Sequence, residues 1–340
     1  MPDQTHTDSG VEAAAARLLA APLVAARPAA GGGNNRVYRA ETREGVFAIK
    51  FYPHQDTDPR DRLGQEFAAL ALMNDFGIDC VPRTFARDTA LGCAAYEWIE
   101  GSAPGPASDA DADAMAALCA SLAGIDAARA TDVCPASASC FSGADVTAQF
   151  TERLARLRAA AADSALHAFL DNRLAPGFEL LERRARNAYG GAGLDFDAPM
   201  ADRARTLSPS DFGSHNALRR PDGSLVFLDF EYFGWDDPVK MIADACWHPG
   251  SALPAAAAAR FRAAMLDFFA ARDGEALRTR FDALSPLFGM IWCLIVLNEF
   301  LPERWARRVA AGKTDDAAAA RTRQLQAAEA LFSKVTERYS

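Results

Sequence analysis

The sequence predicts an α+β protein of two lobes: a small antiparallel β-sheet lobe with one helix, and a larger, mostly helical lobe. Apolar and polar residues alternate through residues 37–53, which is the period of a half-buried strand. Prolines and a glycine at 104–106 mark a hinge, and the chain beyond it has the alanine, leucine and arginine periodicity of helices. We therefore expect an N-terminal extension and helix over 1–22, a sheet lobe over 23–100 and a helical lobe over 101–340.

The elements of the first lobe follow from local patterns. Alanine-rich residues 11–22 predict a helix that ends at a proline. Residues 37–53 turn at "TREG" and predict a β-hairpin, and "RTFARD" and "CAAYEWIEG" predict two further strands. Between them, apolar residues at helical spacing predict a helix from about Pro59 to Phe76 that stops at Gly77.

The second lobe is predicted to be helical from a cap at Ser108 or Asp109 to about residue 190. A loop over 189–200 and an acidic strand-loop segment over 210–238 follow, and helices continue to the C-terminus. "LFGMIWCLIVLNEFL" falls short of the roughly 20 apolar residues that span a bilayer. We expect it to be a buried helix and expect no membrane span.

Composition narrows the class of protein. A formal charge of −9 over 340 residues argues against a nucleic-acid partner, since nonspecific binding to phosphates needs a basic surface. The polar, acidic start "MPDQTHTDSG" does not resemble a secretory signal. No pair of cysteines has C-x-x-C spacing, which disfavours a zinc ribbon, and a cytoplasmic location is expected. The seven cysteines are Cys80, Cys93, Cys119, Cys134, Cys140, Cys246 and Cys293.

Two features of the first lobe are typical of phosphate binding. Gly31, Gly32 and Gly33 lie between strand-like segments, where glycines let backbone amides approach a phosphate, although a flexible hairpin turn would look the same. Lys50 lies in the apolar strand "VFAIKFY", and Glu66 follows 16 residues later on the predicted helix. A lysine oriented by a helix carboxylate can hold phosphate oxygens, whereas a surface ion pair is the alternative explanation.

The acidic segment "SDFGSHNALRRPDGSLVFLDFEYFGWDDP" is the strongest signal for chemistry. Carboxylates beside an apolar strand are costly to desolvate unless a positive group lies among them. Asn216 and Asp229 offer the oxygen ligands that Mg²⁺ prefers, which leaves Asp211 to face a substrate hydroxyl. Each residue alone could instead cap a turn or end a strand.

Together these residues resemble the aminoglycoside-phosphotransferase and choline-kinase branch of the protein-kinase-like fold. "GGGNNRVYRA" is similar to the nucleotide loop of that family, "FAIKFY" to its ATP-lysine strand and "SDFGSHN" to its catalytic loop. "LVFLDFEYFGWDDP" resembles the metal-binding strand, and "DFEY" is particularly similar to choline and ethanolamine kinases. One residue departs from the pattern, because Pro209 stands where the family has a histidine.

The resemblance implies a bilobal kinase that uses ATP and Mg²⁺ and phosphorylates a hydroxyl of a small molecule. Asp211 is implied as the catalytic base, and Asn216 and Asp229 as metal ligands. The nucleotide is expected to contact the glycine loop, the lysine with its helix glutamate, and the connection between lobes: Gly31, Gly32, Gly33, Asn34, Asn35, Lys50, Glu66, Glu97 and Ile99.

The acceptor is expected to be a sugar, an amino sugar or an amino alcohol such as choline or ethanolamine. Aromatic and acidic side chains near the metal strand and on a late helix are the candidate contacts: Glu231, Tyr232, Trp235, Asp236, Trp292 and Glu299. An aminoglycoside is an alternative acceptor. A catalytically weak or silent nucleotide-binding module is the alternative function, and Pro209 is the feature in its favour.

Overall fold

A computed structural model describes residues 8–29, 35–52, 60–160, 163–251, 253–310 and 316–339. The chain forms two units. Unit 1 comprises Met1–Gly105, Gly124–Val133 and Ser214–Phe233, and unit 2 comprises Pro106–Ala123, Cys134–Gly213 and Gly234–Ser340. The first break, after Gly105, falls within the hinge expected from the sequence. The division differs from the predicted continuous lobe over 101–340, because residues 214–233 pack with the sheet unit.

Unit 1 is built on a five-stranded antiparallel sheet in the order β1-β2-β3-β5-β4. Thr42 pairs with Gly45 at the turn between β2 and β3, as the hairpin prediction requires. The elements in chain order are α1 (Asp8–Leu19), β1 (Leu23–Pro28), β2 (Arg36–Thr42), β3 (Gly45–Phe51), α2 (Arg62–Asp75), β4 (Thr84–Asp88) and β5 (Cys93–Glu97). The predicted α+β fold with a small antiparallel sheet is confirmed.

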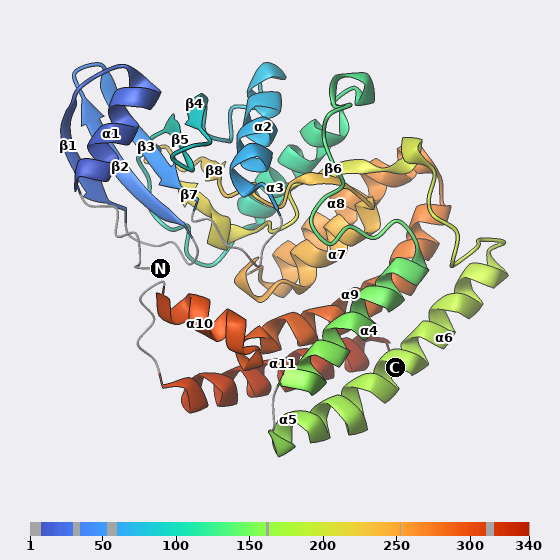
Figure 1. The fold of residues 1–340 in the computed structure, drawn as a ribbon. Helices are drawn as coiled ribbons and strands as arrows, with labels where there is room; N and C mark the ends of the chain where they lie inside the picture. Colours follow the sequence, from blue (N-terminus) through green and yellow to red (C-terminus); the bar gives the residue numbers. More distant parts are fainter. Residues whose placement is uncertain are drawn as a thin grey trace. The chain divides into compact units, whose positions relative to one another are not determined.

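The two faces of the sheet carry different side chains because residues alternate along each strand. Ile49 and Phe51 of β3 pack in an apolar cluster with Val11 and Ala15 of α1, which lies across the sheet in Figure 1. Residues 8–19 are therefore part of the core of unit 1, not an appended extension. Lys50 points to the opposite face, where its ammonium meets Glu66 of α2.

Helix α2 begins three residues later than the sequence suggested. Asp61 is its N-cap, and the Asp61 carboxylate accepts a hydrogen bond of 2.8 Å from the Gly64 N–H. This cap satisfies one of the amides that have no partner within the first turn. The predicted start at Pro59 lies outside the described residues.

A short hairpin of unit 1 lies between the two candidate metal ligands, Asn216 and Asp229. Strands β7 (Ala217–Arg219) and β8 (Leu225–Phe227) pair with Ala217 opposite Phe227. The Leu228 N–H donates to the Asn216 carbonyl over 2.8 Å, which extends the ladder by one step. The Phe227 N–H donates to the Cys80 carbonyl over 2.8 Å and ties the hairpin to the rest of the unit.

Unit 2 is mostly helical, as predicted for the second lobe. Its α-helices are α3 (Asp109–Ala123), α4 (Gly143–Ala160), α5 (Ser164–Phe169), α6 (Ala175–Gly191), α7 (Pro238–Trp247), α8 (Ala255–Asp273), α9 (Ala276–Val296), α10 (Pro302–Ala310) and α11 (Ala317–Tyr339). A π-helical turn, Leu170–Leu174, joins α5 to α6. Strands β6 (Thr206–Ser208) and β9 (Gly234–Asp236) form an antiparallel pair.

The sequence pattern predicted the start of α3 but not the largely non-helical segment between α3 and α4. The Ser108 hydroxyl accepts from the Asp111 N–H at 3.3 Å, and the Asp111 carboxylate accepts from the Ser108 N–H at 2.8 Å. This reciprocal cap confirms the start predicted at Ser108. Residues 124–142, which the periodicity assigned to helix, contain only a short 3₁₀ turn, and α6 continues to Gly191, into the predicted loop.

Helix α9 is the core of unit 2. It packs against α4, α6, α7, α8 and α11, and every residue from Ala283 to Leu294 is buried. A helix that is apolar on all sides must be surrounded by protein or by lipid. The segment Ala276–Phe300 has the length and hydropathy of a membrane span, and 78% of its apolar window is buried inside the fold. The prediction of a buried helix is therefore confirmed.

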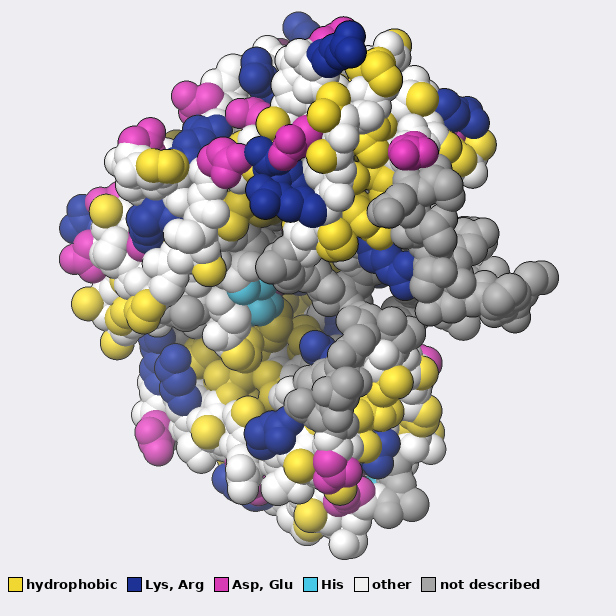
Figure 2. Space-filling model, turned by 90° about the vertical axis from the view of Figure 1, so that its left-hand side faces the viewer, with side chains coloured by type: hydrophobic (Ala, Val, Ile, Leu, Met, Phe, Trp, Pro, Cys, Tyr) yellow, Lys and Arg dark blue, Asp and Glu magenta, His cyan; other side chains and the backbone are white. Residues whose placement is uncertain are grey.

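Opposite charges are interspersed on the surface. Figure 2 shows acidic and basic side chains mixed on one face among the residues that it describes. Several exposed pairs of unit 2 are in contact, including Arg173 with Glu329 at 3.1 Å and Arg260 with Asp113 at 2.5 Å. Such exposed pairs each contribute about 0–1 kcal/mol to stability.

Substituting Gly234 tests the packing at the start of β9. A Cβ at this position would lie 2.4 Å from the Cys134 carbonyl oxygen and 2.5 Å from the Ala136 nitrogen, which are backbone atoms. We expect Gly234→Ala to destabilise unit 2 by about 1–3 kcal/mol, measured by chemical unfolding. The matched control is Gly190→Ala in α6, where no atom lies within 4 Å of the added Cβ. This control should be neutral or stabilise the protein by about 0.5–1 kcal/mol, and equal effects of both variants would contradict the tight packing at Gly234.

Candidate functional site

Lys50 joins three segments of unit 1 through its ammonium group. Its Nζ donates to Glu66 Oε2 of α2 at 2.7 Å and to Asp229 Oδ1 at 2.7 Å. The Lys50 side chain is 10% exposed and that of Glu66 is 4% exposed, so this is a buried pair and not the surface ion pair considered as the alternative. The structure therefore brings together the strand lysine, the helix glutamate and the aspartate after β8.

Two tyrosines extend this network beyond the residues that the sequence singled out. The Tyr52 hydroxyl donates to Glu66 Oε2 at 2.7 Å and lies 2.8 Å from the Tyr96 hydroxyl. Burial raises the pKa of Tyr52 well above its usual range, with Glu66 adding to the shift, so the phenol stays neutral and remains a donor. Tyr52 stands two residues after Lys50, which places both side chains on the same face of the strand's continuation.

The charges in this network compensate one another. Burial lowers the pKa of Lys50, but Glu66 and Asp229 outweigh burial, and the net pKa lies above its ordinary value. Burial raises the pKa of Glu66, against the opposing effect of Lys50. The lysine therefore carries a full positive charge in a place where water screens it little.

Asp229 is held in an uncommon backbone conformation. Its φ is +66°, in the left-handed region that a non-glycine residue adopts at a cost of order 1–3 kcal/mol. The hairpin ladder between Asn216 and Leu228 fixes the residue immediately before it. The Asp229 side chain is 35% exposed, so one face of this carboxylate stays open while Lys50 holds the other. Asn216 and Asp229 thus offer two oxygen donors at one end of the hairpin, a donor set that suits Mg²⁺.

Glu231 and Tyr232 contact residues of unit 1. Glu231 is 1% exposed, accepts from Asn35 Nδ2 at 3.0 Å and lies 3.9 Å from Arg62 Nη1. Glu231 therefore anchors Asn35, the residue before β2, and its predicted contact with an acceptor stays a prediction. Arg60 stacks 4.6 Å from the ring centroid of Tyr232. The predicted nucleotide contacts Gly31, Gly32, Gly33 and Asn34 lie outside the described residues.

The predicted adenine contacts are only partly available. The Glu97 N–H donates to the Arg83 carbonyl over 2.8 Å, which pairs the ends of β4 and β5. This N–H is therefore engaged within the sheet, and the predicted backbone contacts of the nucleotide from Glu97 to Ile99 stay a prediction. Ile99 is buried, with 6% of its surface exposed, just beyond the end of β5.

Asp211 belongs to unit 2 and lies in a loop after β6. Its Oδ1 is 3.0 Å from Nε2 of His248, and its side chain is 35% exposed. The preceding residue, Ser210, has φ +65°, a second left-handed non-glycine position. No sequence pattern connects Asp211 with His248, because the two residues are far apart along the chain and share no motif.

Two of the predicted acceptor contacts have structural roles in unit 2. Asp236 is 0% exposed, lies 3.1 Å from Lys240 Nζ and accepts from the Cys140 N–H at 3.0 Å. Burial raises the pKa of Asp236 to about 6, against the opposing effect of Lys240. Glu299 is 2% exposed and lies 3.0 Å from Arg308. Both carboxylates are held by basic partners with almost no surface to offer an acceptor, which corrects the prediction.

The two tryptophans predicted to contact the acceptor, Trp235 and Trp292, differ in exposure. Trp292 is 9% exposed, and its Nε1 donates to Asp244 Oδ1 at 2.8 Å. Trp235 lies half-buried in β9, opposite Leu207. Trp292 is therefore fixed as part of the fold, whereas Trp235 is only partly buried. The roles of Trp235 and Tyr232 toward an acceptor stay predictions.

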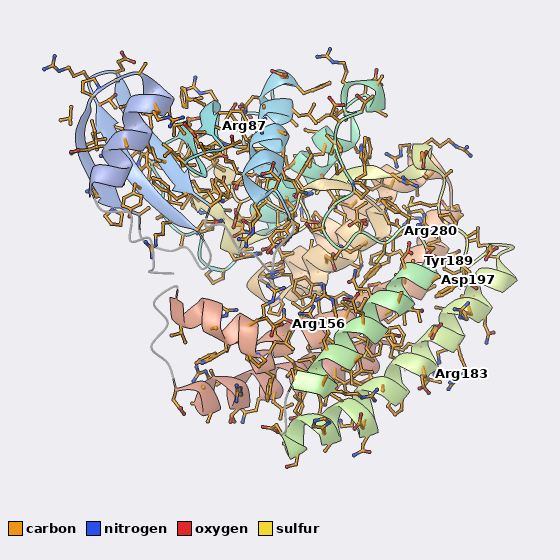
Figure 3. The ribbon with its side chains drawn as sticks, viewed as in Figure 1. Arg87, Arg156, Arg183, Tyr189, Asp197 and Arg280 are labelled. Atoms are coloured by element: carbon orange, nitrogen blue, oxygen red, sulfur yellow. The ribbon has the colours of Figure 1, made fainter. Side chains whose placement is uncertain are left out.

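Other polar groups of unit 2 serve the fold. Asp237 caps α7 by accepting from the Val239 N–H at 2.8 Å, and Arg280 binds the same carboxylate. Figure 3 labels Arg280 and Tyr189 where α9 and α6 meet. Burial raises the pKa of Tyr189 to about 12, against the opposing effect of Arg280.

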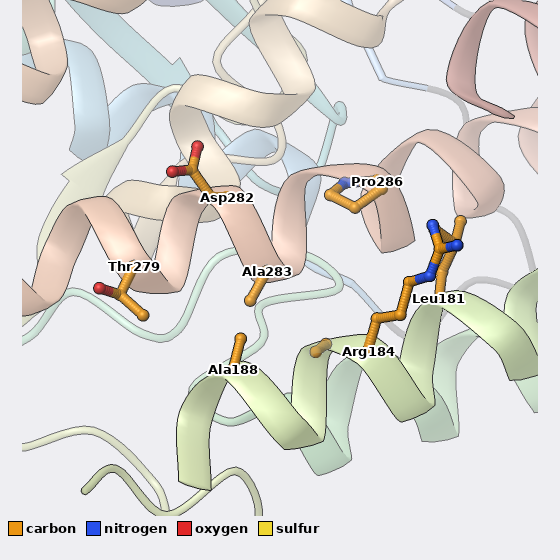
Figure 4. A pocket seen from close by; sticks show the side chains of 8 residues that line it. Leu181, Arg184, Ala188, Thr279, Asp282, Ala283 and Pro286 are labelled. Carbon is orange, nitrogen blue, oxygen red and sulfur yellow. The ribbon is translucent and has the colours of Figure 1, made fainter. Parts of the chain in front are cut away.

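A separate cavity of about 290 Å³ lies between α6 and α9. Figure 4 shows Ala188 and Ala283 facing each other across it, with Thr279 and Arg184 further along. Its lining is Leu181, Arg184, Ala185, Ala188, Thr279, Asp282, Ala283 and Pro286. None of the predicted site residues lines this cavity.

A protein family and several solved structures match most of the chain. The model of the "Phosphotransferase enzyme family" matches residues 25–284. No curated protein sequence matches the chain. Choline kinase LicA from Streptococcus pneumoniae is similar in structure, with 16% identity, a TM-score of 0.58 and coverage of 97% of this chain and 100% of LicA. A second LicA structure contains AMP and has 17% identity, a TM-score of 0.56 and coverage of 96% and 97%.

Two further solved structures share the fold. Macrolide 2'-phosphotransferase MphH from Brachybacterium faecium has 17% identity and a TM-score of 0.53, covering 91% of this chain and 99% of its own. Ethanolamine kinase from Plasmodium vivax has 14% identity and a TM-score of 0.54, covering 92% and 83%. At these identities the likeness shows the protein-kinase-like fold.

The buried pair can be tested by removing the charge of Glu66. Glu66→Gln keeps the size of the side chain but leaves the Lys50 ammonium less compensated, and we expect a loss of about 3 kcal/mol in the free energy of unfolding. Glu329→Gln is the matched control, because Glu329 pairs with Arg173 at the surface, where both side chains are 42% exposed. The control should change stability by less than about 1 kcal/mol. Similar losses in both variants, measured by chemical unfolding, would argue against the proposed dependence of Lys50 on Glu66.

Proposed function

Because the chain belongs to the phosphotransferase enzyme family, we propose that it transfers the γ-phosphate of ATP to a hydroxyl group of a small metabolite. The observation that carries this proposal is the position of Lys50 Nζ, 2.7 Å from both Glu66 and Asp229. An ammonium oriented in this way is suited to hold phosphate oxygens. The presence of AMP in one of the LicA structures supports an adenine nucleotide as the donor.

Lys50 and its partners bind and orient the triphosphate in this proposal. Glu66 holds the Lys50 ammonium, and Tyr52 holds the Glu66 carboxylate, so that little side-chain entropy is lost when phosphate oxygens arrive. Asn35, anchored by Glu231, fixes the start of β2 directly after the glycine segment. Backbone amides of that segment are proposed to cover the phosphates.

Asn216 and Asp229 are the residues that would hold Mg²⁺. When bound, the ion would neutralise charge on the β- and γ-phosphates. The Asp229 carboxylate is already oriented by its left-handed backbone and by Lys50, and Asn216 is tied to the same end of the hairpin. The metal dependence of the enzyme is therefore proposed to reside in these two side chains.

Asp211 is proposed to act on the acceptor. As the acceptor oxygen bonds to the γ-phosphorus, the bond from that phosphorus to the β–γ bridging oxygen breaks and ADP leaves. The proton of the acceptor hydroxyl passes to the Asp211 carboxylate. The half-exposed state of Asp211 is compatible with contact to a small molecule.

The acceptor is proposed to be a sugar, an amino sugar or an amino alcohol. Choline and ethanolamine kinases are among the similar structures, and so is a phosphotransferase that acts on a macrolide. Tyr232 and Trp235 remain half-buried and can offer aromatic faces to an ammonium group or a sugar ring. The three carboxylates expected among the acceptor contacts, Glu231, Asp236 and Glu299, are each at most 2% exposed.

Replacing Asp211 tests the proposed chemistry. ATP consumption is measured with choline, ethanolamine, simple sugars, amino sugars and aminoglycosides, and we expect one class to stimulate turnover. Asp211→Asn should then lower kcat by about 10²–10⁴ while the Kd of ATP stays within a few-fold, because the base acts only in the transition state. Asp113→Asn, at an exposed carboxylate of unit 2, is the matched control and should leave kcat unchanged.

Two results would count against this proposal. Near-full activity of Asp211→Asn would remove Asp211 from its role as base. Wild-type protein that binds ATP but consumes none with any acceptor would favour a silent nucleotide-binding module, the function that Pro209 raises as an alternative.

A further inference from the structure

The loop that carries Asp211 is supported by the turn after α7. The left-handed backbone at Ser210 needs support, and the Ser210 N–H donates to Ser208 Oγ at 3.2 Å. On the other side, Ser251 Oγ donates to the Phe212 carbonyl at 3.3 Å. His248 lies in the same turn and reaches the Asp211 carboxylate at 3.0 Å. The turn 248–251 thus holds both the side chain of Asp211 and the backbone next to it.

The hydrogen bonds of His248 assign its tautomer. The Gly250 N–H donates to Nδ1 of His248 at 2.8 Å, so Nδ1 is an acceptor and carries no proton. The proton of the neutral imidazole is then on Nε2, which lies 3.0 Å from Asp211 Oδ1. His248 therefore donates an N–H to Asp211 without needing a positive charge.

The orientation of the His248 ring is fixed by its neighbours. The ring packs edge-on against Trp292, with 4.3 Å between the ring centroids. Trp292 Nε1 donates to Asp244 Oδ1 at 2.8 Å, and Lys240 Nζ donates to Asp244 Oδ2 at 2.7 Å. The backbone N–H of His248 donates to the Asp244 carbonyl over 2.8 Å. The donor is consequently preorganised before any ligand binds.

We propose that His248 is a positioning residue for the phosphotransfer reaction, which holds the Asp211 carboxylate in one orientation through its Nε2–H. This inference rests on the proposed function, in which Asp211 accepts the acceptor's proton. The sequence has Pro209 where the resembled family has a histidine, and His248 supplies support to the same loop from a different segment.

The kinetic test compares two substitutions of His248. His248→Phe keeps an aromatic ring against Trp292 but has no donor, and we expect kcat to fall about tenfold to a hundredfold with the KM for ATP within twofold. His248→Gln keeps an N–H and should recover kcat to within several-fold of wild type. His167→Phe in α5 is the matched control and should leave both constants unchanged. A kcat for His248→Phe within about twofold of wild type, or equal losses in the Phe and Gln variants, overturns the proposal.

A second measurement does not depend on activity. Nitrogen-15 spectra of histidine-labelled full-length protein contain signals from five histidines, and the signal lost in His248→Gln identifies His248. We expect a protonated Nε2 and an unprotonated Nδ1, and the opposite tautomer overturns the proposal even if the Phe variant does not fold. If wild-type protein consumes no ATP with any acceptor, the proposed function fails and the positioning role falls with it. The spectrum then still shows whether His248 donates to Asp211.

Discussion

A single buried ammonium, that of Lys50, links the elements of unit 1 whose residues have proposed roles in phosphate and metal binding. Lys50 is charged in surroundings that disfavour charge, and it remains so because Glu66 and Asp229 are both within 2.7 Å. Losing one partner would leave an undercompensated charge in the protein interior. Lys50 consequently couples three parts of unit 1. These are strand β3, the first half of α2 and the strained turn at Asp229. The same groups are those proposed to bind the triphosphate and a divalent cation.

In unit 2, the carboxylate of Asp211 is also held in place by neighbouring groups, which here are neutral hydrogen-bond donors. A strained backbone at Ser210 presents Asp211, and a turn that includes His248 and Ser251 holds it in place. In both units, a non-glycine residue in the left-handed region either carries or precedes a carboxylate with a proposed role. Such strain persists only where the surrounding contacts fix it, and it is frequent at functional sites.

The sequence predicted the parts of the site that depend on local pattern. Strand alternation and helix periodicity placed Lys50 and Glu66 on facing elements, and the ladder of β7 and β8 places Asn216 and Asp229 at one end of a hairpin. Burial of individual carboxylates was not predictable, because Asp236 and Glu299 are neutralised by Lys240 and Arg308, whose positions depend on tertiary packing. The contact between His248 and Asp211 was missed for the same reason. The split of the chain after Gly213 also depends on long-range contacts such as that between Phe227 and Cys80.

We propose that the Asp229 carboxylate connects Lys50, the metal ion and the nucleotide. The most direct measurement is the Kd of ATP by calorimetry with and without Mg²⁺, for wild-type protein and for Asp229→Asn. We expect Mg²⁺ to tighten ATP binding by about tenfold in the wild type and by less than about twofold in the variant. An equal enhancement by Mg²⁺ in both proteins would contradict it.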